Sequence, residues 1–87
     1  MKYLAGMMGN PIGENVPSES PKAWGFTYRH GYTASMDEIR WIPKSVLKVG
    51  EDNGNGWVEV MIPLWFIAKN RWAEQLAEIQ YKGIVEI

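Results

Sequence analysis

Three short segments in which large apolar side chains recur at every second position constrain the fold of this chain most. They span residues 22–28 (KAWGFTY), 38–43 (EIRWIP) and 57–62 (WVEVMI). Strict alternation puts every second side chain on one face of an extended strand, and aromatic and β-branched residues favour strands. The chain has 87 residues and no cysteine, so neither disulfides nor thiolate metal sites can support the fold. We therefore expect one small domain that depends on its apolar core.

A stretch with few helix-breaking residues follows the third strand. Pro63 occupies a position that suits the first turn of a helix. Apolar residues then recur at helical spacing, at Trp65, Ala68, Trp72, Leu76 and Ile79. We predict a helix over residues 64–82, or two short helices if Asn70 interrupts it, with Gly83 as the stop. Residues 84–87 (IVEI) are expected to form a last short strand.

The first 21 residues are expected to behave differently from the rest. Residues 2–8 are predicted to add one edge strand, and residues 9–21 to form an extended arm with few backbone hydrogen bonds, because they contain Pro11, Pro17 and Pro21. The expected organisation is an N-terminal edge strand and flexible arm over 1–21, then a single small α+β domain over 22–87.

The predicted fold class is α+β. We expect a small antiparallel sheet or partly open barrel of three to five strands, with one C-terminal helix or two short ones packed on it. Residues 50–56 (GEDNGNG) are predicted to be a hairpin loop because they contain two Asn-Gly pairs. The alternation and the helical stripe predict a core containing Trp24, Phe26, Ile39, Trp41, Val58, Val60, Ile62, Trp65 and Leu76.

The order of three segments resembles a small uncharacterised module of phage and bacterial proteins. These are residues 22–24 (KAW), 38–47 (EIRWIPKSVL) and 58–70 (VEVMIPLWFIAKN). In that module a strand leads to a WIPKS strand and then to an IPxW helix start. The resemblance implies a small β-rich phage or mobile-element protein and brings no catalytic role with it. This chain departs from the module in the 29–37 turn, in the 50–56 loop and in its C-terminal extension.

No group of residues predicts catalysis. His30 is the single histidine, and the residues around Ser35 offer no nucleophile elbow. One histidine is too few for a zinc site, and the 50–56 loop lacks the spacing of a calcium-binding loop. The carboxylate pairs at 37–38 and 51–52 are predicted to be solvated turn charges. We predict a protein that is not an enzyme and uses no cofactor or metal.

The surplus of aromatic residues favours a protein that acts by binding. The chain has eleven of them, and aromatic side chains are preferred anchors of protein interfaces. The first hypothesis is an inhibitor-like phage protein that contacts a host or defence protein. The apolar residues of the helix cover more than one face, so Phe66 is expected on its outer face and self-association stays open. The residues expected at the contact are Tyr28, Arg29, Tyr32, Phe66 and Trp72.

The second hypothesis is a small nucleic-acid-binding module that uses the hairpin at residues 28–48. Aromatic residues there would stack on bases while basic residues contact phosphates, the basic set being Arg29, Arg40, Lys44 and Lys48. The net charge of −1 gives no global basic field to support this.

The sequence also bears on location. The apolar start is too short and too glycine-broken for a signal peptide. No apolar run approaches the ~18 residues of a membrane span. We expect a cytoplasmic protein without membrane contact, in the host cytoplasm if a phage encodes it.

Overall fold

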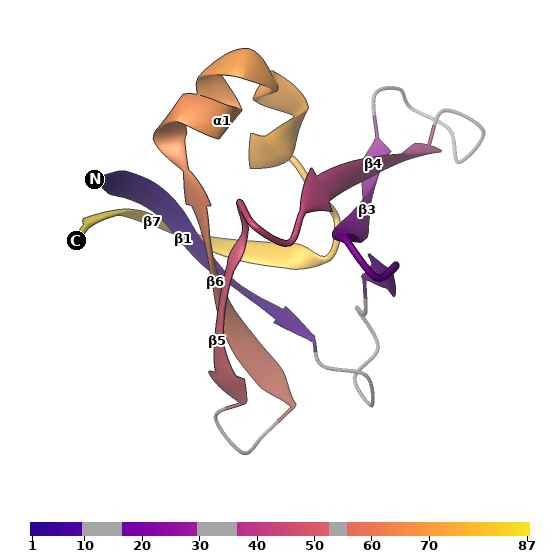
Figure 1. Cartoon of the computed structure of the whole chain (residues 1–87), viewed down its shortest axis with the longest axis horizontal. Helices are drawn as coiled ribbons and strands as arrows, with labels where there is room; N and C mark the ends of the chain where they lie inside the picture. Colours follow the sequence, from indigo (N-terminus) through magenta and orange to yellow (C-terminus); the bar gives the residue numbers. More distant parts are fainter. Residues whose placement is uncertain (10–16, 30–36, 53–55) are drawn as a thin grey trace.

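The computed structural model describes residues 1–9, 17–29, 37–52 and 56–87. The described strands form two open antiparallel sheets, of order β5-β6-β1-β7 and β2-β3-β4 (Figure 1). This confirms the predicted α+β class, with an open sheet rather than a closed barrel. In chain order the elements are β1 (Lys2–Gly9), β2 (Ser18–Glu19), β3 (Ala23–Arg29), β4 (Asp37–Pro43), β5 (Lys48–Asp52), β6 (Trp57–Pro63), α1 (Leu64–Lys69), the 3-10 turn η2 (Arg71–Glu74) and β7 (Ile79–Glu86).

Strand β1 lies in the middle of the four-stranded sheet, not at an edge as expected. Leu4 is opposite Ile62 of β6 on one side and Ile84 of β7 on the other. Both partners are more than fifty residues away along the chain, so a local pattern contains no signal for this position. The hairpin loop predicted at residues 50–56 is shorter than expected, because β5 runs to Asp52 and pairs with β6 as the two strands of a hairpin.

The core lies between the two sheets and α1. Five predicted core residues are buried, namely Phe26, Val58, Val60, Ile62 and Leu76, and Trp24 packs against them half-buried. The buried cluster also contains residues that the alternation did not select: Met8, Ile42, Leu47, Phe66, Ile67, Ala73 and Ile79.

Ile39 and Trp41 are exposed, so their predicted place in the core is wrong. The alternation in β4 is as expected, but the opposite face turns inward. Phe26 is fully buried in β3, and its cross-strand partner in β4 is Arg40. Cross-strand partners share a face of the sheet, so the side of β4 that carries Arg40 and the buried Ile42 faces the core. Ile39 and Trp41 are thereby placed on the outside.

The helical segment is shorter than predicted. Helix α1 ends at Lys69, and the Asn70 N–H donates to the carbonyl oxygens of Phe66 and Ile67. Of the two alternatives left open, the structure shows the one with an interruption at Asn70, and η2 is the second short helical piece. Residues 79–86 are strand, however, because they pair with β1 along their length. Gly83 does not stop a helix: it has a φ of +144° beside a register shift in β7.

Two further predictions about α1 are wrong. Trp65 is 47% exposed rather than part of the core, and Phe66 is buried rather than on the outer face. A helix of six residues turns only one narrow side to the sheet, and Phe66 and Ile67 occupy that side. The stripe that predicted the opposite relied on positions beyond Lys69, where the helix no longer continues.

The segment before β7 fastens the three-stranded sheet to the rest of the molecule. The Thr27 N–H donates to Oε1 of Glu78 at 2.7 Å, and the Thr27 hydroxyl donates to Oε2 at 2.7 Å. The Ala77 N–H donates to the Thr27 carbonyl at 3.0 Å, and Leu76 forms a β-bridge with Tyr28. These contacts use the stretch of the β3 edge that the two-residue strand β2 leaves uncovered.

Tyr81 ties η2 to β7. Its hydroxyl donates to the Ala73 carbonyl at 2.7 Å and accepts from the Leu76 N–H at 3.0 Å. Burial raises the pKa of Tyr81 to about 12, opposed by the Leu76 hydrogen bond and assisted by the nearby carboxylates of Glu74 and Glu78.

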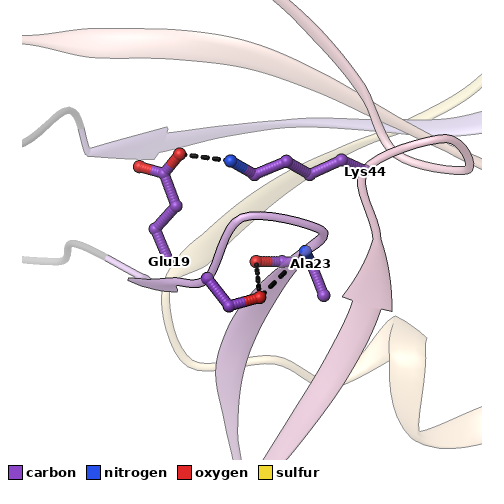
Figure 2. A network of polar contacts seen from close by, with 4 residues as sticks. Glu19, Ala23 and Lys44 are labelled. Carbon is purple, nitrogen blue, oxygen red and sulfur yellow. Dashed lines mark hydrogen bonds and ion pairs between the residues drawn. The ribbon is translucent and has the colours of Figure 1, made fainter.

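The predicted arm is partly ordered. Residues 10–16 lie outside the described residues, but Pro17 is buried and β2 pairs with β3. Ser20 closes a turn in which its N–H and hydroxyl donate to the Ala23 carbonyl and its Oγ accepts from the Ala23 N–H (Figure 2). The expected scarcity of hydrogen bonds is therefore wrong for residues 17–20. In the described parts of the chain, no helix has the length and apolarity needed to cross a bilayer.

Candidate protein-binding surface

On the outer face of β3 and β4, the aromatic ring of Trp41 lies close to the backbone of Gly25. Gly25 is opposite Trp41, and Thr27 is opposite Ile39. A Cβ atom built at Gly25 would lie 2.9 Å from the Trp41 ring and 3.1 Å from Cγ2 of Ile39. The first distance is shorter than real carbon contacts and the second is tighter than most of them, so the indole occupies the space that the missing side chain leaves. Glycine within a strand often marks such a close approach.

We call Gly25, Ile39 and Trp41 the Trp41 platform. Ile39 is 50% exposed and Trp41 is 47% exposed, so two large apolar side chains lie together on one face of an open sheet. A ring already held by packing loses little conformational freedom when a partner covers it. Tryptophan in such a position is typical of the residues that dominate binding energy at protein interfaces.

Three of the predicted contact residues lie close together on the inner side of the same sheet: Tyr28 on β3, Phe66 on α1 and Trp72 on η2. Cζ of Arg40 lies 5.6 Å from the Tyr28 ring centroid and 6.0 Å from that of Trp72. Trp72 in turn meets Phe66 edge to face at 5.8 Å. Arg40 also forms an ion pair with Glu38, while its Nε is buried without a hydrogen bond. Tyr28, Phe66 and Trp72 are thus brought together, but mainly to pack against one another and Arg40.

The remaining predicted contact residues are only partly visible. Arg29 is the last residue of β3, opposite Asp37, and its side chain lies outside the described residues. Tyr32 and His30 also lie outside them.

The basic residues of the predicted nucleic-acid site that the structure describes lie in different parts of the molecule. Arg40 lies on the inner face. Lys44 pairs with Glu19 (Figure 2), and its Nζ is 5.0 Å from the ring centroid of Trp24, an inner-face residue. Lys48 belongs to the other sheet, with its Nζ 5.2 Å from the Tyr3 ring centroid. The fold therefore separates these cations from the Trp41 platform.

A shallow hollow of about 420 Å³ offers little chemistry. It is lined by Trp57, Ala77, Glu78, Ile79 and Gln80. The carboxylate of Glu78 already accepts two hydrogen bonds from Thr27. Across the described residues, no three His, Cys, Asp or Glu side chains are arranged to hold a metal ion.

Comparison of the chain with known protein families, curated proteins and solved structures gave no match. Sequence reasoning missed the Trp41 platform because it placed both large side chains in the core. Gly25, in the middle of an aromatic strand, was the signal that could have indicated a close packing partner.

Proposed function

We propose that this protein is a non-enzymatic binding protein that contacts another protein through the Trp41 platform. The observation that carries the proposal is the half-exposed indole of Trp41, held in place over Gly25 and flanked by the equally exposed Ile39. A preorganised aromatic anchor with an aliphatic neighbour suits an apolar pocket or ridge on a protein partner. In the phage setting that the resemblance implies, the partner is a host or defence protein and the contact is inhibitory.

The arrangement of charge favours a protein over a nucleic acid. A surface that stacks bases needs cations close by to follow the phosphate backbone. Arg40 and Lys44 instead contact rings on the inner side of the sheet, and each is paired with a carboxylate. The Trp41 platform is thus apolar where a nucleic acid would require positive charge.

The test compares two tryptophans of equal exposure. Trp41 and Trp65 are both 47% exposed, but they lie on β4 and α1 respectively. Immobilised wild-type protein, Trp41→Ala and Trp65→Ala are each used to capture proteins from a nuclease-treated bacterial lysate, and the Kd of each captured protein is then measured. We expect a partner that binds wild type and Trp65→Ala alike but binds Trp41→Ala about 30-fold more weakly, which corresponds to a loss of ~2 kcal/mol.

Circular dichroism and urea unfolding of each variant show whether the loss arises at the surface or through stability. The same proteins are titrated with single-stranded and duplex oligonucleotides over a series of salt concentrations. Oligonucleotide binding with a steep dependence on salt, in the absence of a Trp41-dependent protein partner, would overturn the proposal in favour of the nucleic-acid module. Equal loss of partner binding in both tryptophan variants would remove the Trp41 platform from the proposal.

A further inference from the structure

The last residues of β7 form the least protected sheet edge in the described structure. Natural edge strands are usually short, charged, irregular or interrupted by proline. Strand β2 is two residues long, β5 contains a register shift, and β4 carries three charged residues and ends in Pro43. At the end of β7, Ile84 is 64% exposed, Val85 38% and Ile87 68%.

A row of apolar side chains crosses the four-stranded sheet, and its last member, at this edge, is exposed. Ile62 of β6, Leu4 of β1 and Ile84 of β7 are successive cross-strand partners and share one face. Ile62 is fully buried, Leu4 is half-buried, and Ile84 is mostly exposed. The core layer therefore continues to the outermost strand, where no described element covers it.

The backbone groups that point away from the sheet follow from the pairing with β1. The Met1 amino group donates to the Ile87 carbonyl at 2.7 Å, and the Ile87 N–H donates back to the Met1 carbonyl at 3.0 Å. Hydrogen-bonded and non-bonded pairs alternate along an antiparallel ladder. Val85 therefore bonds to β1, while Ile84 and Glu86 direct their N–H and C=O groups outward.

We propose that this edge pairs with the same edge of a second copy of the chain, antiparallel about a twofold axis at Val85. The outward N–H and C=O groups of Ile84 and Glu86 can form hydrogen bonds with those of the second copy in three registers of the two strands. Placing Glu86 opposite Glu86 of the second copy brings like charges together. Placing Ile84 opposite Ile84 carries Glu86 into the register shift beside Gly83. Only Ile84 opposite Glu86 pairs every outward group within the regular part of the strand.

The side chains on the other face fit this register. Val85 meets Val85 of the second copy in a non-bonded pair, and Ile87 falls opposite Gly83 of the second copy. A Cβ atom built at Gly83 has no atom within 4 Å, so there is open space for the isoleucine. The two four-stranded sheets then join into one of eight strands. Because the joined segment is short, we expect weak association, with a Kd of roughly 10–100 µM.

Single cysteines test the register directly, because the natural chain has no cysteine. In a non-bonded antiparallel pair the Cα atoms are roughly 4.5 Å apart, a separation that a disulfide spans. Val85→Cys is compared with Ile87→Cys on the same strand and with Val49→Cys on β5, the opposite edge of the sheet. Each is oxidised with glutathione disulfide at protein concentrations around the expected Kd.

We expect Val85→Cys to form a disulfide-linked dimer at least tenfold faster than either control, although Ile87 is the most exposed of the three positions. Sedimentation equilibrium of the wild type should show a monomer–dimer equilibrium that Val85→Lys, with two ammonium groups at the axis, abolishes. A wild type that stays monomeric at 1 mM, about tenfold above the upper limit of the expected Kd, would overturn the proposal. So would Ile87→Cys reacting as fast as Val85→Cys. Trp41→Ala should leave the dimer unchanged, so this test is independent of the proposed function.

Discussion

Removing the carboxylate of Glu78 should destabilise the protein more than any other change to a polar side chain described above. Glu78 accepts two hydrogen bonds of 2.7 Å from Thr27, one from the backbone N–H and one from the hydroxyl, across 51 residues of chain. These bonds hold β3, and with it the three-stranded sheet, against the segment that leads into β7. The Glu78→Ala variant breaks both and leaves the Thr27 N–H without its acceptor.

The expected size follows from the bond types. A hydrogen bond to a charged group contributes about 1.5–3 kcal/mol, and the lower end applies here because both residues are half-buried. Two such bonds, with partial recovery by water, give a loss of ~2–3 kcal/mol for Glu78→Ala. Glu78→Gln keeps an acceptor for the Thr27 N–H and should lose only ~1 kcal/mol. For a domain whose total stability is of order 5–15 kcal/mol, the larger loss is substantial.

Urea unfolding followed by tryptophan fluorescence measures these differences. Thr27→Val removes only the hydroxyl bond and should cost ~1 kcal/mol. The double variant Thr27→Val with Glu78→Ala should then be less destabilised than the sum of the two single variants, because both remove the same bond. Strictly additive losses, or a Glu78→Ala variant within ~0.5 kcal/mol of wild type, would refute the role of Glu78 as the fastening between the sheets.

Two further changes probe the surface and the core. Gly25→Ala places a methyl group 2.9 Å from the Trp41 ring, so we expect a changed tryptophan emission spectrum and a loss of ~1–3 kcal/mol; an unaltered spectrum would contradict the packing of the indole. Tyr81 has a pKa raised from 10.0 to about 12 in the folded state, so its folded form holds the proton more tightly than its unfolded form. The resulting stability, ~1–2 kcal/mol after allowance for partial exposure, is fully present below pH 10 and should be lost as the pH rises to 12. Unfolding of Tyr81→Phe across this range should lack that decline.

The elements that the sequence predicted well are those defined by local patterns. Strands β3, β4 and β6 were visible because their alternation runs through five or more residues, and Asn70 was recognised as an interruption of the helix. The position of β1 and the strand character of 79–83 were not visible. Both arise from the pairing of β1 with β7, which lie far apart in the sequence. The spacing of Leu76 and Ile79 is that of a helix, but residues 79–86 form a strand because they pair with β1.

The surface was harder to predict than the strands. In β4 either face could have been the inner one, since one carries Ile39 and Trp41 and the other carries Ile42. The choice depends on the register with β3, where Phe26 and Arg40 share a face. The stem of an arginine can pack between aromatic rings while its charged end reaches a carboxylate, as Arg40 does with Glu38. The alternation of large apolar residues therefore selected the wrong face of β4 as the inner one.

The central position of β1 affects how the chain folds as it is made. Residues 2–9 leave the ribosome well before their partners, because β6 begins only after residue 56 and β7 only after residue 78. At a synthesis rate of about 5–20 residues per second, the last of these partners begins to emerge roughly 4–14 s later. Until then an apolar strand with two unpaired edges stays exposed to chaperones and to other nascent chains. The four-stranded sheet can therefore close only after residues 79–86 have emerged, and its closing pairings are of the long-range kind that makes folding slow.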